Sequence, residues 1–507
     1  MKESNKQIKL GAMMSYVAIV FNIIAGLLYT PWMVRQIGKS DYGLYVLVTS
    51  FLTYFIMDFG LGQAIARFIA RYRAEKADQK TNQLLGLTSK LYLWINLVLL
   101  VILVFIYFFI ENIFIELSPL EILKFKTIYC IAGLFSLISF PFAPLNGVLI
   151  AYERFILLKL CDVFSKVGTI ICMVIALYLG YKLYALVAIN ALVGIVIIVF
   201  KLVYLNRTTT IKIDFNYKSK ELSKELFGFS IWITVIGIAQ RLLINLAPTL
   251  LGVFSGTIQI AIFSIGIIIE GYVWTFANAL NGLFLPKVAA LTSIHDNRDA
   301  VTNLMIRVGR LQLIMVGLLF VILICLGKEF ITLWMGPDFS ESYLIVLFLI
   351  IPSFFTLTQE IASTLLYIEN EVKYKAILFI SASIVSIVIG SFLIPTTGAL
   401  GAAIGISIAL FLFHVLGMNI VYVKIMKLNI FYFFTECYLK MALPLGLSLA
   451  AGLIINFYIR ASHFALFGVK VLLLFFIYVF FMWFLGLNKN EKEIFRSTIR
   501  RVISLKK

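Results

Sequence analysis

Apolar runs of about 20 residues, separated by short charged or turn-rich segments, repeat along the whole chain. A helix needs roughly this length to cross about 30 Å of hydrocarbon. Reading the runs between their polar boundaries predicts fourteen membrane-spanning helices. The predicted spans are 10–34, 43–66, 87–110, 125–150, 156–180, 183–205, 227–250, 254–283, 308–327, 342–366, 374–395, 398–423, 437–458 and 463–487.

Composition agrees with this pattern. The 507 residues are 62% hydrophobic and 13% charged, with a mean hydropathy of +1.01, whereas a soluble protein carries about 25% charged residues. A membrane β-barrel would show alternation in segments of about 10 residues, and the sequence shows none. The first run is too long for a signal peptide and lacks a small-residue cleavage site, so we expect it to be a retained helix. The chain is therefore expected to be an all-α polytopic membrane protein.

The positive charges predict how the helices are oriented. If the N-terminus is cytoplasmic, most of the 43 Lys and Arg residues fall in cytoplasmic loops, which is the positive-inside pattern. The linker 201–224 alone carries six of them. We expect both termini and this linker to be cytoplasmic and the loop 111–124 to lie outside. The net charge of +18 then reflects topology and contact with anionic membrane lipids, and nucleic acid is not an expected partner.

The C-terminal tail, residues 488–507, repeats apolar residues at helical spacing among basic ones. This pattern favours an interfacial helix on the cytoplasmic leaflet, and a disordered basic tail is the alternative.

Side chains that usually mark enzymes are scattered. The five cysteines form no CxxC pair, the three histidines are far apart, and no Walker A, GxSxG or HExxH motif occurs. We expect no enzymatic activity, no metal site and no cofactor.

The chain also contains a weak internal repeat. TPWMVRQIGKSDYGLY at 30–45 and APTLLGVFSGTIQIAIFS at 247–264 follow the same plan, with Pro31 and Pro248 in equivalent places. VLIAYERF at 148–155 recurs as LLYIENEVK at 365–373. Six spans separate equivalent points, and this even number predicts two halves of the same topology, related by a pseudo-two-fold axis along the membrane normal.

The predicted organisation follows from this repeat: a six-helix lobe over 1–207, a second six-helix lobe over 208–430, two extra helices over 431–487, and the tail 488–507. Two similar bundles favour a transporter that works by alternating access.

Three segments of the sequence resemble those of a known protein family. RQIGKSDYGLYVLVTSFLTYFIMDFGLGQAIARFIAR at 35–71, LWMGPDFSES at 333–342 and TGALGAAIGISIA at 397–409 resemble polysaccharide flippases of the Wzx type. These belong to the multidrug/oligosaccharidyl-lipid/polysaccharide (MOP) exporter superfamily. The resemblance implies a flippase in the bacterial cytoplasmic (inner) membrane that moves a lipid-linked oligosaccharide, such as an O-antigen repeat unit on undecaprenyl diphosphate, to the outer leaflet. It further allows a coupling ion (proton or sodium) and a polysaccharide polymerase complex as partners.

Charged residues within the spans are the candidate substrate-binding residues, because a charge in hydrocarbon needs a partner or water. On one continuous helix, Asp58 and Arg67 would point to opposite faces and could not pair. We expect Arg67 to reach the cytoplasmic headgroups. For Asp58, a buried structural pair and a direct role in transport both stay open.

Asp162 and Lys166 are four residues apart in the order that favours an intrahelical ion pair, which we expect them to form. Glu360 has no partner nearby in the sequence, and Pro352, eight residues earlier, is expected to kink its helix.

Arg241 is the most informative of these charges because it lies seven residues before Pro248, deep in the seventh span. Glu270 lies at a similar expected depth in the eighth span. The two residues could form a bridge, or the guanidinium could face a central cavity and hold a diphosphate in a bidentate manner.

Three competing functions remain. A cation-coupled multidrug exporter of the same superfamily would need a cavity dominated by acids, and Arg67, Lys166 and Arg241 argue against it. A lipid II flippase belongs to the same superfamily, and the sequence alone distinguishes it poorly from a polysaccharide flippase. A polysaccharide polymerase or ligase would usually carry a large outer loop, whereas the loop 111–124 is short and largely apolar.

Overall fold

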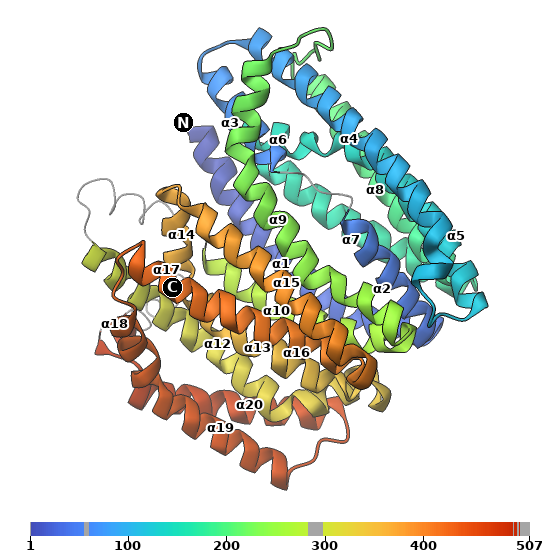
Figure 1. Ribbon diagram of the computed structural model, residues 1–507. Coiled ribbons are helices and arrows are strands. Elements are labelled where there is room, and N and C mark those ends of the chain that lie inside the picture. The colour runs from blue at the N-terminus through green and yellow to red at the C-terminus, as the bar shows by residue number, and fades with distance from the viewer. Residues whose placement is uncertain (1, 55–59, 282–297, 490, 494–495, 497–507) are drawn as a thin grey trace, which may run out of the picture. The chain divides into compact units, whose positions relative to one another are not determined.

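The computed structural model describes residues 2–54, 60–281, 298–489, 491–493 and 496, which form helices and no strand (Figure 1). Thirteen helices within these residues are long and apolar enough to cross a membrane. They correspond to thirteen of the predicted spans, so the prediction of an all-α polytopic membrane protein is confirmed.

The chain divides into two compact units, and each is described by itself. Unit 1 comprises residues 1–264 and 372–409, and unit 2 comprises residues 265–371 and 410–507. The division of the chain into two lobes, 1–207 and 208–430, stays a prediction. So does the assignment of the helices over 431–487 to a separate, added part. Most of the tail 488–507 lies outside the described residues.

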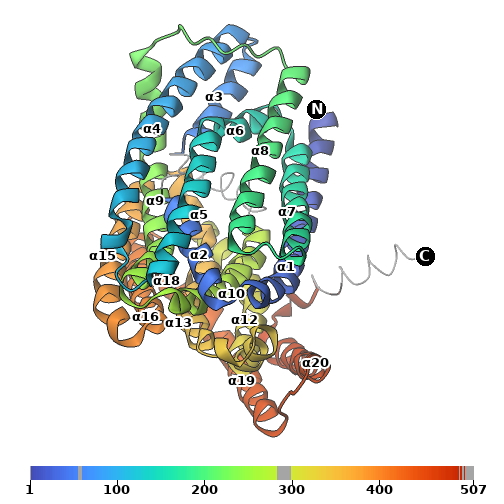
Figure 2. The same cartoon turned by 90° about the vertical axis from the view of Figure 1, so that its right-hand side faces the viewer.

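Unit 1 is a bundle of helices with close neighbours far apart in the sequence. α1 packs against α7, α3 against α6, and α9 against α15 (Figure 2). Its helices are α1 (Lys2–Ile37), α2 (Lys39–Thr53), α3 (Leu61–Ala74), α4 (Asp78–Ile113), α5 (Pro119–Ser139), the 3-10 turn η1 (Phe140–Phe142), α6 (Pro144–Ala151), α7 (Phe155–Tyr178), α8 (Leu183–Thr208), α9 (Lys220–Phe254), the first part of α10 (Thr257–Asn281), α15 (Val372–Thr397) and α16 (Ala399–Ala409).

The predicted second span, 43–66, is not one continuous helix. α2 ends at Thr53, and α3 begins at Leu61 after Gly60, whose φ of 64° lies in the left-handed region. Glycine adopts this conformation without a steric penalty. The single continuous helix assumed for Asp58 and Arg67 is therefore not present, because the chain leaves the helical conformation at Gly60, and the relative direction of the two side chains stays a prediction. Asp58 itself lies outside the described residues.

The predicted fourth span is also interrupted. α5 starts at a capping box, in which Ser118 and Glu121 exchange hydrogen bonds and Pro119 occupies the first turn. It gives way to the turn η1 and then to α6 where Pro141 and Pro144 follow each other. Proline lacks the N–H that an α-helix needs in its interior, so the chain continues with a new helical segment.

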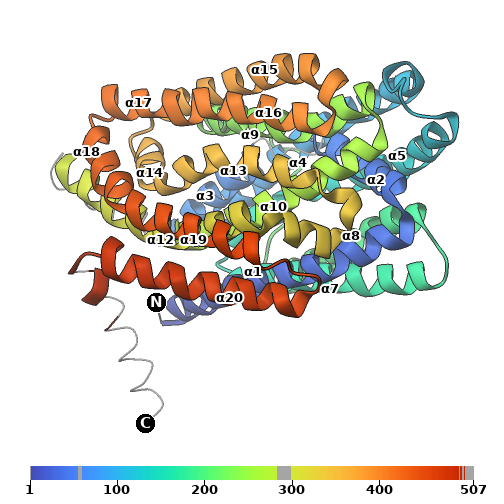
Figure 3. The ribbon, with the colours of Figure 1, turned by 90° about the horizontal axis from the view of Figure 1, so that it is seen from below.

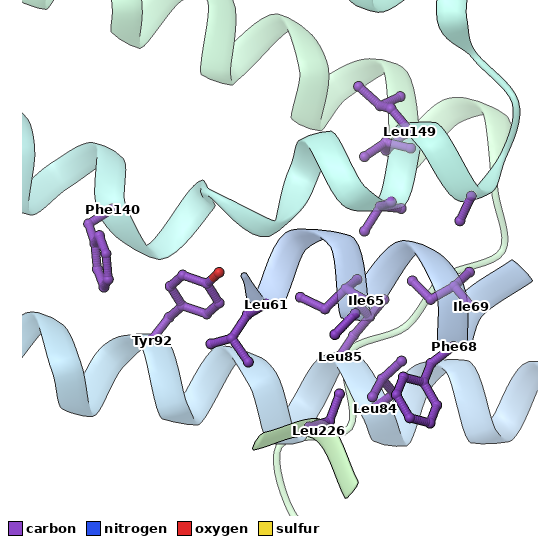
Figure 4. Packing of buried hydrophobic residues seen from close by; sticks show 14 of the residues in the cluster. Leu61, Ile65, Phe68, Ile69, Leu84, Leu85, Tyr92, Phe140, Leu149 and Leu226 are labelled. Carbon is purple, nitrogen blue, oxygen red and sulfur yellow. The ribbon is translucent and has the colours of Figure 1, made fainter. Parts of the chain in front are cut away.

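A cluster of buried apolar side chains fixes α3 in unit 1 (Figure 4). Leu61, Ile65 and Ile69 are fully buried on one face of α3, against Leu84 of α4 and Leu149 of α6. Between helices in a membrane, such contacts stabilise the fold through close van der Waals packing rather than through removal from water. This packing therefore also fixes the direction in which the unburied face of α3 points.

Unit 2 is organised around the long helix α12, which packs against α13, α19 and α20 (Figure 3). Its helices are the rest of α10, α12 (Arg298–Met335), the 3-10 turn η2 (Pro337–Phe339), α13 (Ser342–Thr358), α14 (Glu360–Ile368), the π-helical turns η3 (Leu410–Gly417), η4 (Thr435–Leu439) and η5 (Met482–Gly486), α17 (Met418–Lys424), α18 (Ile430–Phe434), α19 (Lys440–Tyr458) and α20 (Phe464–Phe481).

Left-handed backbone positions recur along the chain at a nearly constant offset. Positive φ angles occur at Gly38 and Gly256, at Glu153 and Asn370, and at Gly180 and Gly398. The members of each pair are 217 or 218 residues apart, which is the offset of the internal repeat. Left-handed residues mark where a helix stops and the chain turns, and the symmetry of the two predicted lobes stays a prediction.

Candidate functional site

The exposed face of α3 carries polar residues. Gln63, Arg67 and Arg71 follow each other at helical spacing and are exposed, opposite the buried face that holds Ile65 and Ile69. At the end of the helix, the Arg71 Nε donates to Glu75 Oε1 over 3.0 Å. This hydrogen bond lowers the pKa of Glu75 below its ordinary value. A face of this kind requires water, lipid headgroups or a polar ligand next to it.

Arg241 lies on α9, which packs against α2. Its side chain is partly buried, and the guanidinium donates a hydrogen bond to the backbone carbonyl of Thr53, the last residue of α2. About two turns further along α9, the Thr249 hydroxyl lies 3.5 Å from that of Tyr54, the residue after Thr53. The last carbonyls of a helix have no intrahelical donor and carry a partial negative charge. A hydrogen-bond donor at this point therefore satisfies a carbonyl at the end of α2, where the predicted second span is interrupted.

Lys166 and Asp162 do not form the ion pair that their spacing predicts. Asp162 instead pairs with Lys159, one turn earlier on α7, over 3.2 Å. Lys159 lies closer to the start of the helix at Phe155, where water and headgroups suit an exposed ion pair. Lys166 is partly buried, and it makes no hydrogen bond or ion pair to the residues that the structure describes.

Glu270 belongs to a polar group within unit 2. Its Oε1 accepts a hydrogen bond from the Ser353 hydroxyl on α13 over 3.1 Å. The Ser353 oxygen in turn accepts from the Trp274 indole N–H over 2.9 Å. Ser353 is buried and follows Pro352, which interrupts the hydrogen bonding of α13. Whether Glu270 also pairs with Arg241 stays a prediction.

Glu360 is the first residue of α14, immediately after α13 ends at Thr358. The predicted tenth span is thus divided at this point. A carboxylate at a helix N-terminus interacts favourably with the exposed N–H groups there. The neighbouring Gln359 is buried, and its Nε2 donates to Asn419 Oδ1 over 2.8 Å.

The candidate residues are divided by charge. The three cations, Arg67, Lys166 and Arg241, belong to unit 1, and the two acids whose structure is described, Glu270 and Glu360, belong to unit 2.

Two further groups of buried charges were not predicted from the sequence. Arg310 of α12 makes a two-pronged ion pair with Glu491, at 2.6 and 2.9 Å, and both side chains are almost fully buried. Lys470 of α20 pairs with Glu329 of α12 over 2.5 Å and donates to Asn456 over 2.9 Å. These partners are separated by 181 and 141 residues, so no local spacing could have predicted them.

The fold defines the class of protein. The structure is similar to a lipid II flippase, MurJ, with a TM-score of 0.67, 16% identity, and coverage of 92% of this chain and 98% of that one. It is similar to a multidrug resistance MATE family transporter of the MOP superfamily, with a TM-score of 0.65, 15% identity, and coverage of 82% and 98%. A MOP superfamily transporter from Pyrococcus furiosus gives a TM-score of 0.53, 16% identity, and coverage of 83% and 96%.

At these identities the likeness shows the fold, which is that of MOP-superfamily transporters. The polysaccharide biosynthesis protein family matches residues 9–281, more than half of the chain, and the chain belongs to this family. Among curated proteins, none matches this chain. The recognition made from the first-loop and second-helix residues is therefore confirmed.

Proposed function

We propose that this protein is a flippase that moves a lipid-linked oligosaccharide across the bacterial cytoplasmic membrane by alternating access, without chemical change to its cargo. The cargo is an oligosaccharide repeat unit on undecaprenyl diphosphate, as the family resemblance implies. Membership of the polysaccharide biosynthesis family and the MOP-type fold both support this proposal.

The partly buried guanidinium of Arg241 is the observation that carries the cargo assignment. A diphosphate is recognised by planar N–H donors that can bind two oxygens at once, and arginine supplies them in a fixed fork. Arg67 adds a second guanidinium on the polar face of α3. Both residues belong to unit 1. Arg241 falls within a predicted span, where a charge is costly unless a polar group or water meets it, and Arg67 is expected at the cytoplasmic headgroups.

Accumulation of the cargo tests the function directly. Deleting the gene should cause a lipid-linked oligosaccharide to accumulate in the cytoplasmic leaflet, and mass spectrometry of extracted lipids would identify its sugars. Complementation with the wild-type gene should remove the accumulated lipid. Normal surface polysaccharide with no accumulated intermediate would contradict the proposal.

A multidrug exporter is the second candidate, because Glu270 and Glu360 are acids at membrane depth. The same deletion strain separates the two functions. Retention of a fluorescent lipophilic cation with no change in lipid-linked sugars would favour the exporter.

A further inference from the structure

A cavity of about 550 Å³ lies in unit 1, between α4, α8, the η1–α6 segment and the linker 209–219 that joins α8 to α9. Ligand sites in proteins have volumes of about 300–1,000 Å³. Most side chains around the cavity are apolar, and Leu93 and Val203 among them are about half exposed. Ser89, Asn206 and Thr209 supply the polar groups of its lining.

The linker forms one wall of the cavity with alternate residues. Ile211, Ile213 and Phe215 line the cavity, whereas the residues between them do not. This alternation is that of an extended chain, in which successive side chains point to opposite sides. Ile213 and Phe215 are 48% and 50% exposed. An extended segment between two helices thus presents bulky apolar side chains to an open apolar space.

The linker is held firmly against α4, so this wall is a fixed part of the fold. The backbone N–H groups of Lys212 and Asp214 donate to the side chain and the backbone carbonyl of Asn82, at 2.9 and 3.2 Å. Lys90 donates to the carbonyl of Tyr217 over 3.2 Å. At Gly86 the approach is so close that a Cβ would lie 1.7 Å from the Asp214 carbonyl oxygen.

Positive charge adjoins the polar part of the cavity. Arg207 follows the lining residue Asn206 and lies one helical turn after the lining residue Val203 on α8. Its side chain is exposed and makes no ion pair with a residue that the structure describes. Lys212 is also exposed, but it lies on the side of the linker opposite to Ile211 and Ile213 and so faces away from the cavity. An apolar cavity next to an exposed guanidinium is complementary to a lipid with an anionic head.

We propose that this cavity binds an anionic phospholipid of the cytoplasmic leaflet. One acyl chain occupies the space lined by Leu85, Leu93, Val203 and Phe215, and Arg207 holds the phosphate. The assignment to this leaflet follows from the predicted cytoplasmic position of the linker. A phospholipid chain suits a cavity of this size better than the much longer polyprenyl chain of the cargo does. The site is therefore distinct from the cargo site and would stabilise the linker between α8 and α9.

Native mass spectrometry on the purified full-length protein tests the site, with palmitoyl-oleoyl phosphatidylglycerol as the probe and phosphatidylcholine of the same chains as reference. The wild type should retain phosphatidylglycerol in preference to phosphatidylcholine. The variant Arg207→Gln should lose that preference. The matched control Lys212→Gln removes one charge from the side of the linker that faces away from the cavity, and it should keep the preference.

A second variant tests whether lipid binding depends on the cavity itself or only on positive charge at the surface. Val203→Trp would place a large side chain at the lining and should reduce the number of bound phosphatidylglycerol molecules while the unfolding temperature without lipid stays normal. Equal binding by the wild type and Arg207→Gln would overturn the proposal, as would unchanged binding by Val203→Trp. Displacement of the phospholipid by undecaprenyl phosphate, or by inorganic phosphate alone, would reassign the site and equally overturn it.

Discussion

The hydroxyl oxygens of Ser40 and Thr257 lie 3.1 Å apart although 217 residues separate them. Both hydroxyls donate to the same carboxylate oxygen, Oε1 of Glu121, over 2.6 and 2.7 Å. Gly43 allows this approach, because a Cβ there would lie 2.0 Å from the Thr257 carbonyl oxygen. The starts of α2, α5 and α10 are thereby joined at the predicted outer side of the membrane.

This junction should open during transport if the protein works by alternating access. Ser40→Cys/Thr257→Cys, in a background without the five native cysteines, should form a disulfide under oxidation because the side chains are already within reach. Export should then fall to background and return on reduction. Each single-cysteine variant is the control and should export normally. Normal export by the fully cross-linked protein would show that the junction stays closed throughout the cycle.

The offset of 217 residues leads to a prediction about the architecture. Ser40 and Thr257 occupy equivalent positions of the two repeats, and the left-handed positions recur at the same offset. In an experimental structure, residues 1–207 should superpose on 208–430 with six helices matching six helices in parallel sense. An antiparallel match, or none, would mean that the recurrence is accidental.

The buried pair of Arg310 and Glu491 should be important for stability. The guanidinium also donates to the carbonyls of Glu436 and Gly486, each over 2.7 Å. Arg310→Ala would leave a buried carboxylate without its cation and should cost about 3–5 kcal/mol. The double variant Arg310→Met/Glu491→Leu removes both charges and should recover most of that loss.

Thermal unfolding of the purified protein in detergent measures both effects. Arg71→Ala is the control, because its pair with Glu75 is exposed and should leave the unfolding temperature nearly unchanged. An unfolding temperature of Arg310→Ala equal to that of the wild type would contradict a stabilising role for the pair.

Features that depend on residues close together in the sequence could be predicted, whereas features that depend on tertiary contacts could not. Spans depend on hydropathy within about 20 residues, so thirteen of the fourteen predicted spans correspond to membrane-length helices in the described part of the chain. The second span contains Gly60 and Gly62 next to Asp58, and hydropathy alone does not detect the helix end that they allow. The predicted ion pair between Asp162 and Lys166 does not form, because Asp162 pairs with Lys159, which is three residues away instead of four. The partners of Arg310 and Lys470 depend on tertiary packing, which no spacing rule reports.

The predicted topology can be checked with single cysteines in the cysteine-free background. Asn216→Cys in the linker and Glu116→Cys in the predicted outer loop are both at exposed positions. In intact cells, an impermeant maleimide should label Glu116→Cys and should label Asn216→Cys only after the membrane is opened, since basic loops stay inside. Labelling of Asn216→Cys in intact cells would reverse the orientation.

Arg241 gives the sharpest test of the cargo site, because its contact with the Thr53 carbonyl offers a purely structural explanation. Arg241→Gln keeps an N–H donor for that carbonyl and removes the charge. Export should be lost in this variant while protein level and unfolding temperature stay normal, because the diphosphate loses its guanidinium. Arg241→Lys should recover only part of the export, since an ammonium keeps the charge but lacks the planar fork.

A bridge between Arg241 and Glu270 would give a different result. Neutralising both residues together would then leave no unpaired charge in the membrane, and function should return. Under the cargo hypothesis, Arg241→Gln/Glu270→Gln should export no better than Arg241→Gln alone, as measured by the lipid-linked intermediate that accumulates. Export by the double variant at the wild-type rate would rule out a role of Arg241 in holding the cargo.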